Sequence, residues 1–369
     1  MVNNDRMVNQ LQEFIRISSP SLHEKQFAAK VKEVLASLGI KCQEDNAGRI
    51  IGGDCGNLFA KIPGDKKKPT LLFSAHLDTV ETGSGIKPVL KKGVLTAAGD
   101  TILGADDKTG VVAILEMLRV LKEKKLPHGP IELVFSVAEE MGLLGAKQFD
   151  CKKLKAKAGF ILDASGPVGG IVVRAPAYDA IDVIITGRAA HAGASPEDGV
   201  SAIQIASQAI ARMQLGRINN KTTANIGLIS GGVARNVVPE HCHLKGEARS
   251  HSPAALARQT QHMLNCLHGA AKRAGGGIEI EVERQFEAFH ATTSSLPVKL
   301  AKSAAKQLKL AFSMKSSGGG ADTAVFAAAG IPSVSVCGGY ENPHSVKECL
   351  PIEQLRLLAE YTLAIVANL

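Results

Sequence analysis

Tryptophan is absent from this 369-residue sequence, and aromatic residues make up only 4% of it. A basic surface that binds nucleic acid usually carries interleaved aromatic residues or a recognised motif. The formal net charge is +8, with lysine clusters at residues 66–68, 122–125 and 152–157. We interpret these clusters as solvated lysines at loops and helix ends, and we expect no nucleic-acid partner.

Long apolar runs and paired cysteines are missing too. No stretch approaches the roughly 20 apolar residues that a membrane span needs, and the N-terminus lacks the basic region and apolar core of a secretory signal. The seven cysteines are scattered, odd in number and free of any CxxC pair. This pattern indicates reduced thiols rather than a disulfide framework or a Cys-ligated zinc. The sequence therefore predicts a cytoplasmic protein without a membrane partner.

Apolar runs and helical patterns alternate through the first half of the chain and again near its end. Buried-type strands are expected at residues 70–75, 131–137, 159–162 and 332–337, and helices at 109–124 and 352–368. Such alternation predicts an α/β fold with a mostly parallel sheet between helix layers. The chain is also long enough for two domains.

The middle of the chain departs from this rhythm. Strands near residues 180–187, 223–230, 241–249 and 278–286, with helices near 199–213 and 253–274, give the order β-α-β-β-α-β. This is the split arrangement of ferredoxin-like domains. We expect a catalytic domain in two parts, residues 1–178 and 290–369, interrupted by an inserted domain at residues 179–289.

Each strand that the sequence predicts for the first domain is followed by a histidine or a carboxylate, and two further carboxylates lie at the start of a predicted helix. These histidines and carboxylates are His76 and Asp78, Asp106 and Asp107, Glu139 and Glu140, Asp163, and His344. Ligands of an open parallel sheet bind beyond the carboxyl ends of its strands. Each residue alone has a structural explanation, such as a hydrogen-bonded core histidine or a helix N-cap. Their convergence on one edge is better explained by a metal site, because adjacent buried acids are costly unless paired or metal-bound.

The donor set indicates which metals fit. Two histidines with several carboxylates suit zinc, and cobalt or manganese nearly as well, whereas magnesium or calcium favours oxygen ligands alone. Five candidate ligands, His76, Asp106, Glu140, Asp163 and His344, exceed what one catalytic zinc needs and suffice for two ions that share a carboxylate. Such a pair predicts hydrolysis of an amide or related acyl bond.

Five separated motifs carry a family resemblance. SAHLDTV, GADDKTG, VAEEMGLLGA, LDASG and NPHS resemble the peptidase T, carboxypeptidase G and acetylornithine deacetylase superfamily of two-zinc hydrolases, over nearly the whole chain. GADDKTG and SGGGADTAVFAAAGIPSV are most similar to peptidase T-like aminopeptidases.

The resemblance implies a role for each matched residue of the metal site. His76 and Asp163 bind the first zinc, Glu140 and His344 bind the second, and Asp106 bridges both. Glu139 acts as the general base toward a zinc-activated water and passes the proton to the leaving amine. Asp78 lies behind His76 and sets its tautomer, while Asp107 is expected to be a helix-start acid rather than a ligand.

The inserted domain corresponds by this resemblance to a lid or dimerisation domain. It implies that His191 steadies the tetrahedral oxyanion, often in the partner subunit's site, that Arg249 grips a substrate carboxylate, and that Asn236 contributes beside Arg249. A homodimer formed through this domain is a further implication.

The function expected from the sequence is a metal-dependent aminopeptidase acting on di- or tripeptides. Two alternatives on the same scaffold are an amidohydrolase that deacylates N-acyl amino acids and a carboxypeptidase that uses Arg249. A non-catalytic binding protein is disfavoured, because Glu139 and all five expected ligands are present.

Overall fold

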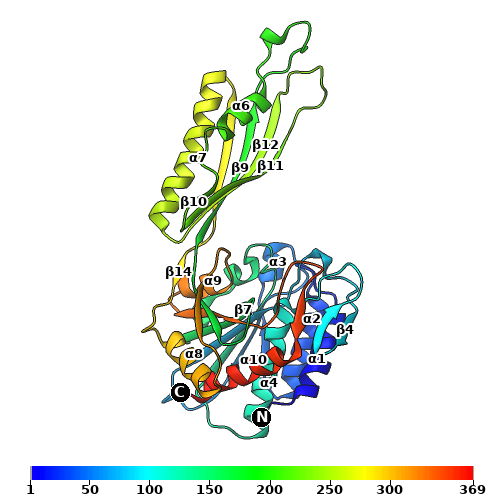
Figure 1. The fold of residues 1–369 in the computed structure, drawn as a ribbon, viewed down its shortest axis with the longest axis vertical. Helices are drawn as coiled ribbons and strands as arrows, with labels where there is room; N and C mark the ends of the chain where they lie inside the picture. Colours follow the sequence, from blue (N-terminus) through cyan, green and yellow to red (C-terminus); the bar gives the residue numbers. More distant parts are fainter. Residues whose placement is uncertain (1, 369) are drawn as a thin grey trace. The chain divides into compact units, whose positions relative to one another are not determined.

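The computed structural model describes residues 2–368. The chain forms two compact units, one made of Met1–Arg174 with Phe289–Leu369 and the other of Ala175–Ala288. No helix in the described part of the chain is long and apolar enough to cross a membrane. Figure 1 shows the elements of each unit. The assignment of catalytic and lid roles to the two units stays a prediction.

A nine-stranded sheet forms the centre of the first unit, in the order β1-β2-β6-β3-β7-β16-β8-β14 with β15 beside β8. Its strands are β1 (Cys42–Glu44), β2 (Leu58–Ile62), β3 (Leu71–His76), β6 (Ile131–Ser136), β7 (Ala158–Ala164), β8 (Gly170–Ala175), β14 (Phe289–His290), β15 (Ser313–Ser316) and β16 (Ser333–Cys337). The four central strands β6, β3, β7 and β16 are parallel to one another. Their carboxyl ends therefore meet at one edge of the sheet.

Helices cover this sheet on both faces. They are α1 (Asn4–Arg16), α2 (Lys25–Ser37), α3 (Ala47–Ile51), α4 (Ala105–Glu123), α5 (Leu144–Gln148), α8 (Leu296–Gln307), α9 (Thr323–Ala328) and α10 (Ile352–Ala367). Helices α1 and α10 both pack against α4, as Figure 1 shows. Alternate residues of the central strands join different cores: Phe73 packs with α1, α4 and α10, whereas Leu72 packs with Phe326 of α9.

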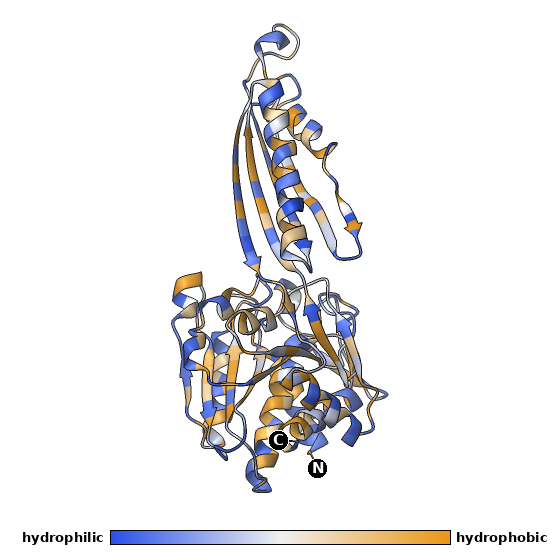
Figure 2. Cartoon of the chain, turned by 90° about the vertical axis from the view of Figure 1, so that its left-hand side faces the viewer, coloured by the Kyte–Doolittle hydropathy of each residue, from blue (hydrophilic) through white to orange (hydrophobic). Residues whose placement is uncertain are grey.

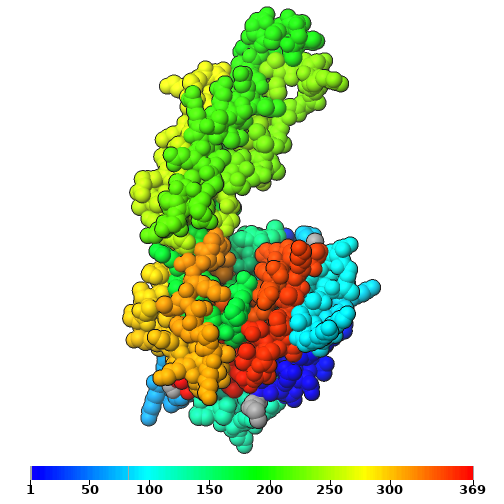
Figure 3. All heavy atoms as spheres, in the orientation of Figure 1, coloured from blue at the N-terminus to red at the C-terminus, as the bar shows by residue number. Residues whose placement is uncertain are grey.

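A small antiparallel sheet completes the first unit and was not expected from the sequence. It contains β4 (Pro88–Lys91), β5 (Val94–Ala97) and β17 (Cys349–Pro351), in the order β17-β5-β4. Pairing of β17 with β5 brings the C-terminal segment beside the segment near residue 95. Figure 3 shows these two segments, in red and cyan, side by side on the surface.

The second unit is a five-stranded antiparallel sheet, in the order β10-β11-β12-β9-β13, packed on two helices. Its elements are β9 (Ala177–Thr186), α6 (Ala202–Ile210), β10 (Gly216–Asn219), β11 (Thr222–Gly231), β12 (His241–Ser250), α7 (Pro253–Ala274) and β13 (Gly277–Phe286). Buried and exposed residues alternate along β9, and Figure 2 shows the same alternation of hydropathy on the long strands. The predicted fold class is confirmed, with β10 as an additional short strand.

Candidate active site

The predicted ligands of the first unit converge at the carboxyl edge of its parallel strands. His76 ends β3, Asp163 lies near the end of β7, Glu139 and Glu140 follow β6, and His344 follows β16. These four strands are neighbours in the order β6-β3-β7-β16. The fifth candidate, Asp106, lies at the start of α4, which packs on β3 and β7.

Distances among these side chains are short. The Nε2 atom of His76 lies 3.1 Å from Oδ1 of Asp106, and Nε2 of His344 lies 3.5 Å from Oδ2 of the same carboxylate. His344 also lies 2.8 Å from Oε1 of Glu140. The potential ligand atoms of His76, Asp106 and Glu140 all lie within 4.8 Å of one another. Asp106 thus stands between the two histidines, as a shared ligand would.

A second group consists of His76, Glu139 and Asp163, whose potential ligand atoms also lie within 4.8 Å of one another. The structure therefore brings together all five predicted ligands and the predicted base. Because Glu139 belongs to this group, its position alone does not separate a base from a ligand. Side-chain exposure is 1% for His76 and 52% for His344, so His344 marks the side of the site that opens to solvent.

Two buried carboxylates hold the loop that carries Glu139 and Glu140. The oxygens of Asp78 accept hydrogen bonds from the backbone N–H groups of Glu139 and Glu140, at 3.0 and 3.1 Å. Glu24 accepts the N–H of the preceding Ala138 at 2.9 Å. Three successive N–H groups are thereby fixed, including that of Ala138, whose φ of 48° is unfavourable for a residue with a side chain.

Asp78 and Asp107 also support His76. The Nδ1 atom of His76 lies 2.9 Å from the carbonyl oxygen of Asp78 and 3.3 Å from its Oδ1, so the ring is oriented with Nε2 toward Asp106. Asp107 accepts the N–H of His76 at 3.2 Å and the N–H of Gly110 at 3.2 Å. The hydrogen bond from Gly110 is the kind that an acidic residue accepts at the start of a helix, as the sequence predicts for Asp107. A cis peptide bond joins Asp106 to Asp107.

The electrostatics of the site favour a bound cation. Burial and the charge of Asp106 raise the pKa of Asp163 to about 8, and burial and the charge of Asp163 raise the pKa of Glu139 well above its ordinary value. Hydrogen bonds that the imidazole of His344 donates to the carboxylates of Asp106 and Glu140 raise its pKa to about 10. These carboxylates crowd one buried place, and a divalent ion would offset their mutual repulsion. The donor set and its charge therefore fit the metal pair expected from the sequence.

Two residues of the site, Tyr340 and Glu348, were not anticipated from the sequence. The hydroxyl of Tyr340 donates to Asp106 at 3.1 Å and lies 3.3 Å from Asp163. Glu348 accepts three backbone N–H groups of the loop that leads to Asp106. Both residues flank the NPHS motif, at four positions before and after His344. That proximity is the one signal in the sequence that points to them.

The residues predicted in the second unit do not all lie together. The N–H of Ala192 donates to the carbonyl of Asn236, so His191 and Asn236 share one end of the unit. Arg249 lies near the other end of β12, about 26 Å from His241 at roughly 3.3 Å per residue. The expectation that Asn236 lies beside Arg249 is therefore wrong within one chain. The motifs that contain Asn236 and Arg249 do not reveal this separation, because most of the ten-residue strand β12 lies between the two residues.

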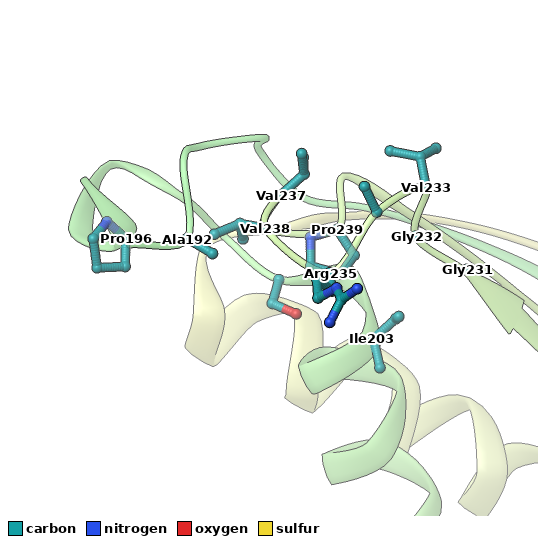
Figure 4. Close-up of a pocket in the computed structure, with 12 residues that line it drawn as sticks. Ala192, Pro196, Ile203, Gly231, Gly232, Val233, Arg235, Val237, Val238 and Pro239 are labelled. Carbon is teal, nitrogen blue, oxygen red and sulfur yellow. The ribbon is translucent and has the colours of Figure 1, made fainter. Parts of the chain in front are cut away.

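Local contacts differ at these two ends. The guanidinium of Arg249 lies over the ring of Tyr178 at 4.4 Å and pairs with Glu247 at 3.0 Å. His191 is exposed, and its Nδ1 accepts the N–H groups of Gly193 and Ala194. Beside His191 and Asn236 lies an open pocket of about 680 Å³. Figure 4 shows it lined mostly by apolar residues and by Arg235.

Known proteins resemble this chain over its whole length. An uncharacterized protein, YqjE of Bacillus subtilis, is 41% identical over 366 residues, covering 99% of both chains. The crystal structure of aminopeptidase PepT from Bacillus cereus matches 100% of this chain and 99% of that one, with 41% identity and a TM-score of 0.92. A tripeptidase from Staphylococcus aureus matches the same shares with 40% identity and a TM-score of 0.96. The model of peptidase family M20/M25/M40 matches residues 72–368. The chain thus belongs to peptidase family M20/M25/M40, which confirms the resemblance carried by its motifs.

Proposed function

We propose that this protein is a metal-dependent aminopeptidase that removes the N-terminal residue from short peptides, chiefly tripeptides and dipeptides. The observation that carries the proposal is the convergence of Glu139 with two histidines and three further carboxylates at one sheet edge. The names aminopeptidase and tripeptidase of two relatives at about 40% identity support the choice of substrate.

In this proposal His76 and Asp163 hold one divalent ion, Glu140 and His344 hold the other, and Asp106 is shared. Zinc fits these nitrogen and oxygen donors best, with cobalt and manganese as alternatives. When bound, the ion pair supplies Lewis acidity toward a carbonyl and lowers the pKa of water.

In this proposal Glu139 transfers the proton, and Asp78 orients the side chains and the loop of the site. Glu139 takes a proton from the attacking water and delivers it to the nitrogen of the leaving amine. Burial, and after it the charge of Asp163, raise the pKa of Glu139 above its ordinary value, and a raised pKa is common among carboxylates that exchange protons in active sites. Asp78 holds the ring of His76 through Nδ1 and, through its two oxygens, the loop of Glu139 and Glu140.

A peptide panel read by mass spectrometry tests the activity. Free tripeptides are expected to lose their first residue, whereas N-acetylated copies of the same peptides remain intact. Tripeptides with an amidated C-terminus show whether the terminal carboxylate is required. Release of the acyl group from N-acyl amino acids, with free peptides untouched, would instead establish a deacylase. Release of the last residue would establish a carboxypeptidase.

The separation of His191 and Asn236 from Arg249 supports a homodimer. A tripeptide is far shorter than the distance of about 26 Å along β12, so the two groups of residues would serve one site only if they came from two chains. The apolar side chain of Val233, 90% exposed at the end that carries His191, is suited to contact with another subunit.

Complementation tests this arrangement. The variants His191→Ala and Arg249→Met are each expected to hydrolyse peptides slowly, and their mixture is expected to regain activity after subunit exchange. A mixture no faster than its components, or a monomer by solution mass, would contradict it.

A cytoplasmic location, consistent with scattered free thiols, belongs to the same proposal.

A further inference from the structure

Glu348 is a buried carboxylate that ties two distant loops of the first unit together. Only 2% of the surface of Glu348 is exposed to solvent. Oε2 accepts the backbone N–H groups of Leu103 at 2.8 Å and Gly104 at 2.7 Å, and Oε1 accepts the N–H of Asp106 at 3.0 Å. The bonded residues lie more than 240 positions apart in the chain.

The first of these loops contains Leu103 and Gly104 and leads to Asp106. Gly104 has a left-handed φ of 71°, and the backbone at Asp106 is not helical although α4 begins there. Helical hydrogen bonds therefore do not fix this stretch, and the carboxylate of Glu348 takes their place as its acceptor. A carboxylate accepts several N–H groups at once, and such charge-assisted bonds are stronger than neutral ones.

The second loop carries His344, four residues before Glu348. The N–H of Glu348 donates to the carbonyl of Ser345, and Cys349 exchanges two backbone hydrogen bonds with Glu341. Glu348 is thus fixed on a short turn that begins next to His344. Its carboxylate joins that turn to the backbone of Asp106, whose own carboxylate lies 3.5 Å from Nε2 of His344.

We propose that Glu348 is a positioning residue that sets the placement of Asp106 relative to His344 and so determines the affinity for the second metal ion. This inference rests on the proposed function, because it assumes that Asp106 and His344 are ligands. Both oxygens of Glu348 accept backbone N–H groups, so in this proposal Glu348 acts through Asp106 rather than as a ligand. Partners behind metal ligands typically alter metal affinity by about 10- to 100-fold when they are removed.

Glu132 offers a matched control. It is also buried, at 3% exposure, and its Oε2 accepts the backbone N–H groups of Lys155 at 2.8 Å and Ala156 at 3.0 Å. It lies at the start of β6, at the opposite edge of the sheet from Glu139 and Glu140. Glu132 also pairs with Lys61 at 3.2 Å. Glu132→Gln therefore neutralises a similar buried carboxylate without touching the loops of the site.

The experiment compares wild-type protein, Glu348→Gln and Glu132→Gln. Zinc content is measured by elemental mass spectrometry, zinc affinity by competition with a chelator, and ligand geometry by the absorption spectrum of the cobalt-substituted protein. We expect Glu348→Gln to bind one of the two ions, which the proposal identifies as the ion of Glu140 and His344, about 10- to 100-fold less tightly than wild type, with a changed cobalt spectrum. Glu132→Gln is expected to keep the wild-type affinity and spectrum.

Thermal melting of the metal-free proteins separates positioning from folding. A general loss of stability would lower the melting temperature of both variants and leave the cobalt spectrum unchanged. Should Glu348→Gln not fold, Glu348→Asp keeps the charge, withdraws the carboxylate by one methylene group and is expected to shift affinity in the same direction.

The outcomes distinguish the inference from the function beneath it. Wild-type protein with two zinc ions, together with unchanged affinity and spectrum in the Glu348 variant, would overturn the positioning role alone. Wild-type protein that binds no zinc, cobalt or manganese would overturn the proposed metal site and the inference with it.

Discussion

Glu139 and Glu140 are adjacent in sequence, yet they are expected to respond differently to the same substitution. Their backbone N–H groups are both held by Asp78, so replacing either side chain by glutamine leaves the loop in place. In the proposed function Glu140, which lies 2.8 Å from His344, is a ligand. Glu139, which is buried beside His76 and Asp163, is the base.

Glutamine at position 139 has no basic oxygen that can carry a proton at neutral pH. General-base catalysis contributes about 10²- to 10⁴-fold, so Glu139→Gln should lower kcat by that factor, or about 3 to 5 kcal/mol in activation free energy. Zinc content should remain that of the wild type. Glu140→Gln should instead lower zinc affinity, with activity partly restored by added zinc.

Steady-state hydrolysis of a free tripeptide, with zinc measured on the same samples, decides between these roles. A kcat for Glu139→Gln within tenfold of the wild-type value would refute its role as base. Loss of zinc from Glu139→Gln with retention in Glu140→Gln would show that the two roles are exchanged.

Three further predictions concern other parts of the chain. Burial raises the pKa of Glu24 from 4.5 to about 7, so the folded protein holds this proton more tightly than the unfolded chain does. The free energy of unfolding should therefore fall by about 3 kcal/mol as pH rises from about 4.5 to 7. Urea denaturation of chelator-treated protein should show that Glu24→Gln gains stability relative to wild type between pH 5 and pH 8. A difference between the two proteins that does not change with pH would contradict this. Arg6→Met removes the guanidinium 2.8 Å from the fully buried carboxylate of Glu116 and leaves only the more distant one of Arg119, at 3.8 Å; it should lower the free energy of unfolding by about 3 kcal/mol. Urea denaturation should show part of that loss recovered when Glu116→Met is added, and a double variant no more stable than the single one would argue against the pair. Arg249→Met should raise KM for tripeptides about 10- to 100-fold with a smaller change in kcat, because a hydrogen-bonded charge pair is worth roughly 1.5–3 kcal/mol; initial rates that leave KM within twofold would remove Arg249 from the substrate site.

The sequence was most informative where local pattern and topology coincide. TLLFSA predicts a buried strand, and the structure places β3 over Leu71–His76, with His76 at its carboxyl end. Parallel strands then carry Asp163 and the loop of Glu140 to the same edge, so their convergence could be inferred before any coordinate was known.

Other features depend on pairings that no local pattern encodes. The strand β17 has three residues and pairs with β5, which lies some 250 positions earlier. The carboxylate of Glu348 finds its N–H partners at a similar separation. The distance between Asn236 and Arg249 follows from the direction of β12, which the motifs themselves do not specify.

The central claim, a peptidase that depends on two metal ions, is tested most directly by metal content and activity on one sample. Protein purified without chelator is predicted to hold about two divalent ions per chain, and chelation should abolish tripeptide hydrolysis until zinc is returned. Full hydrolysis by protein that elemental analysis shows to be metal-free would contradict the account.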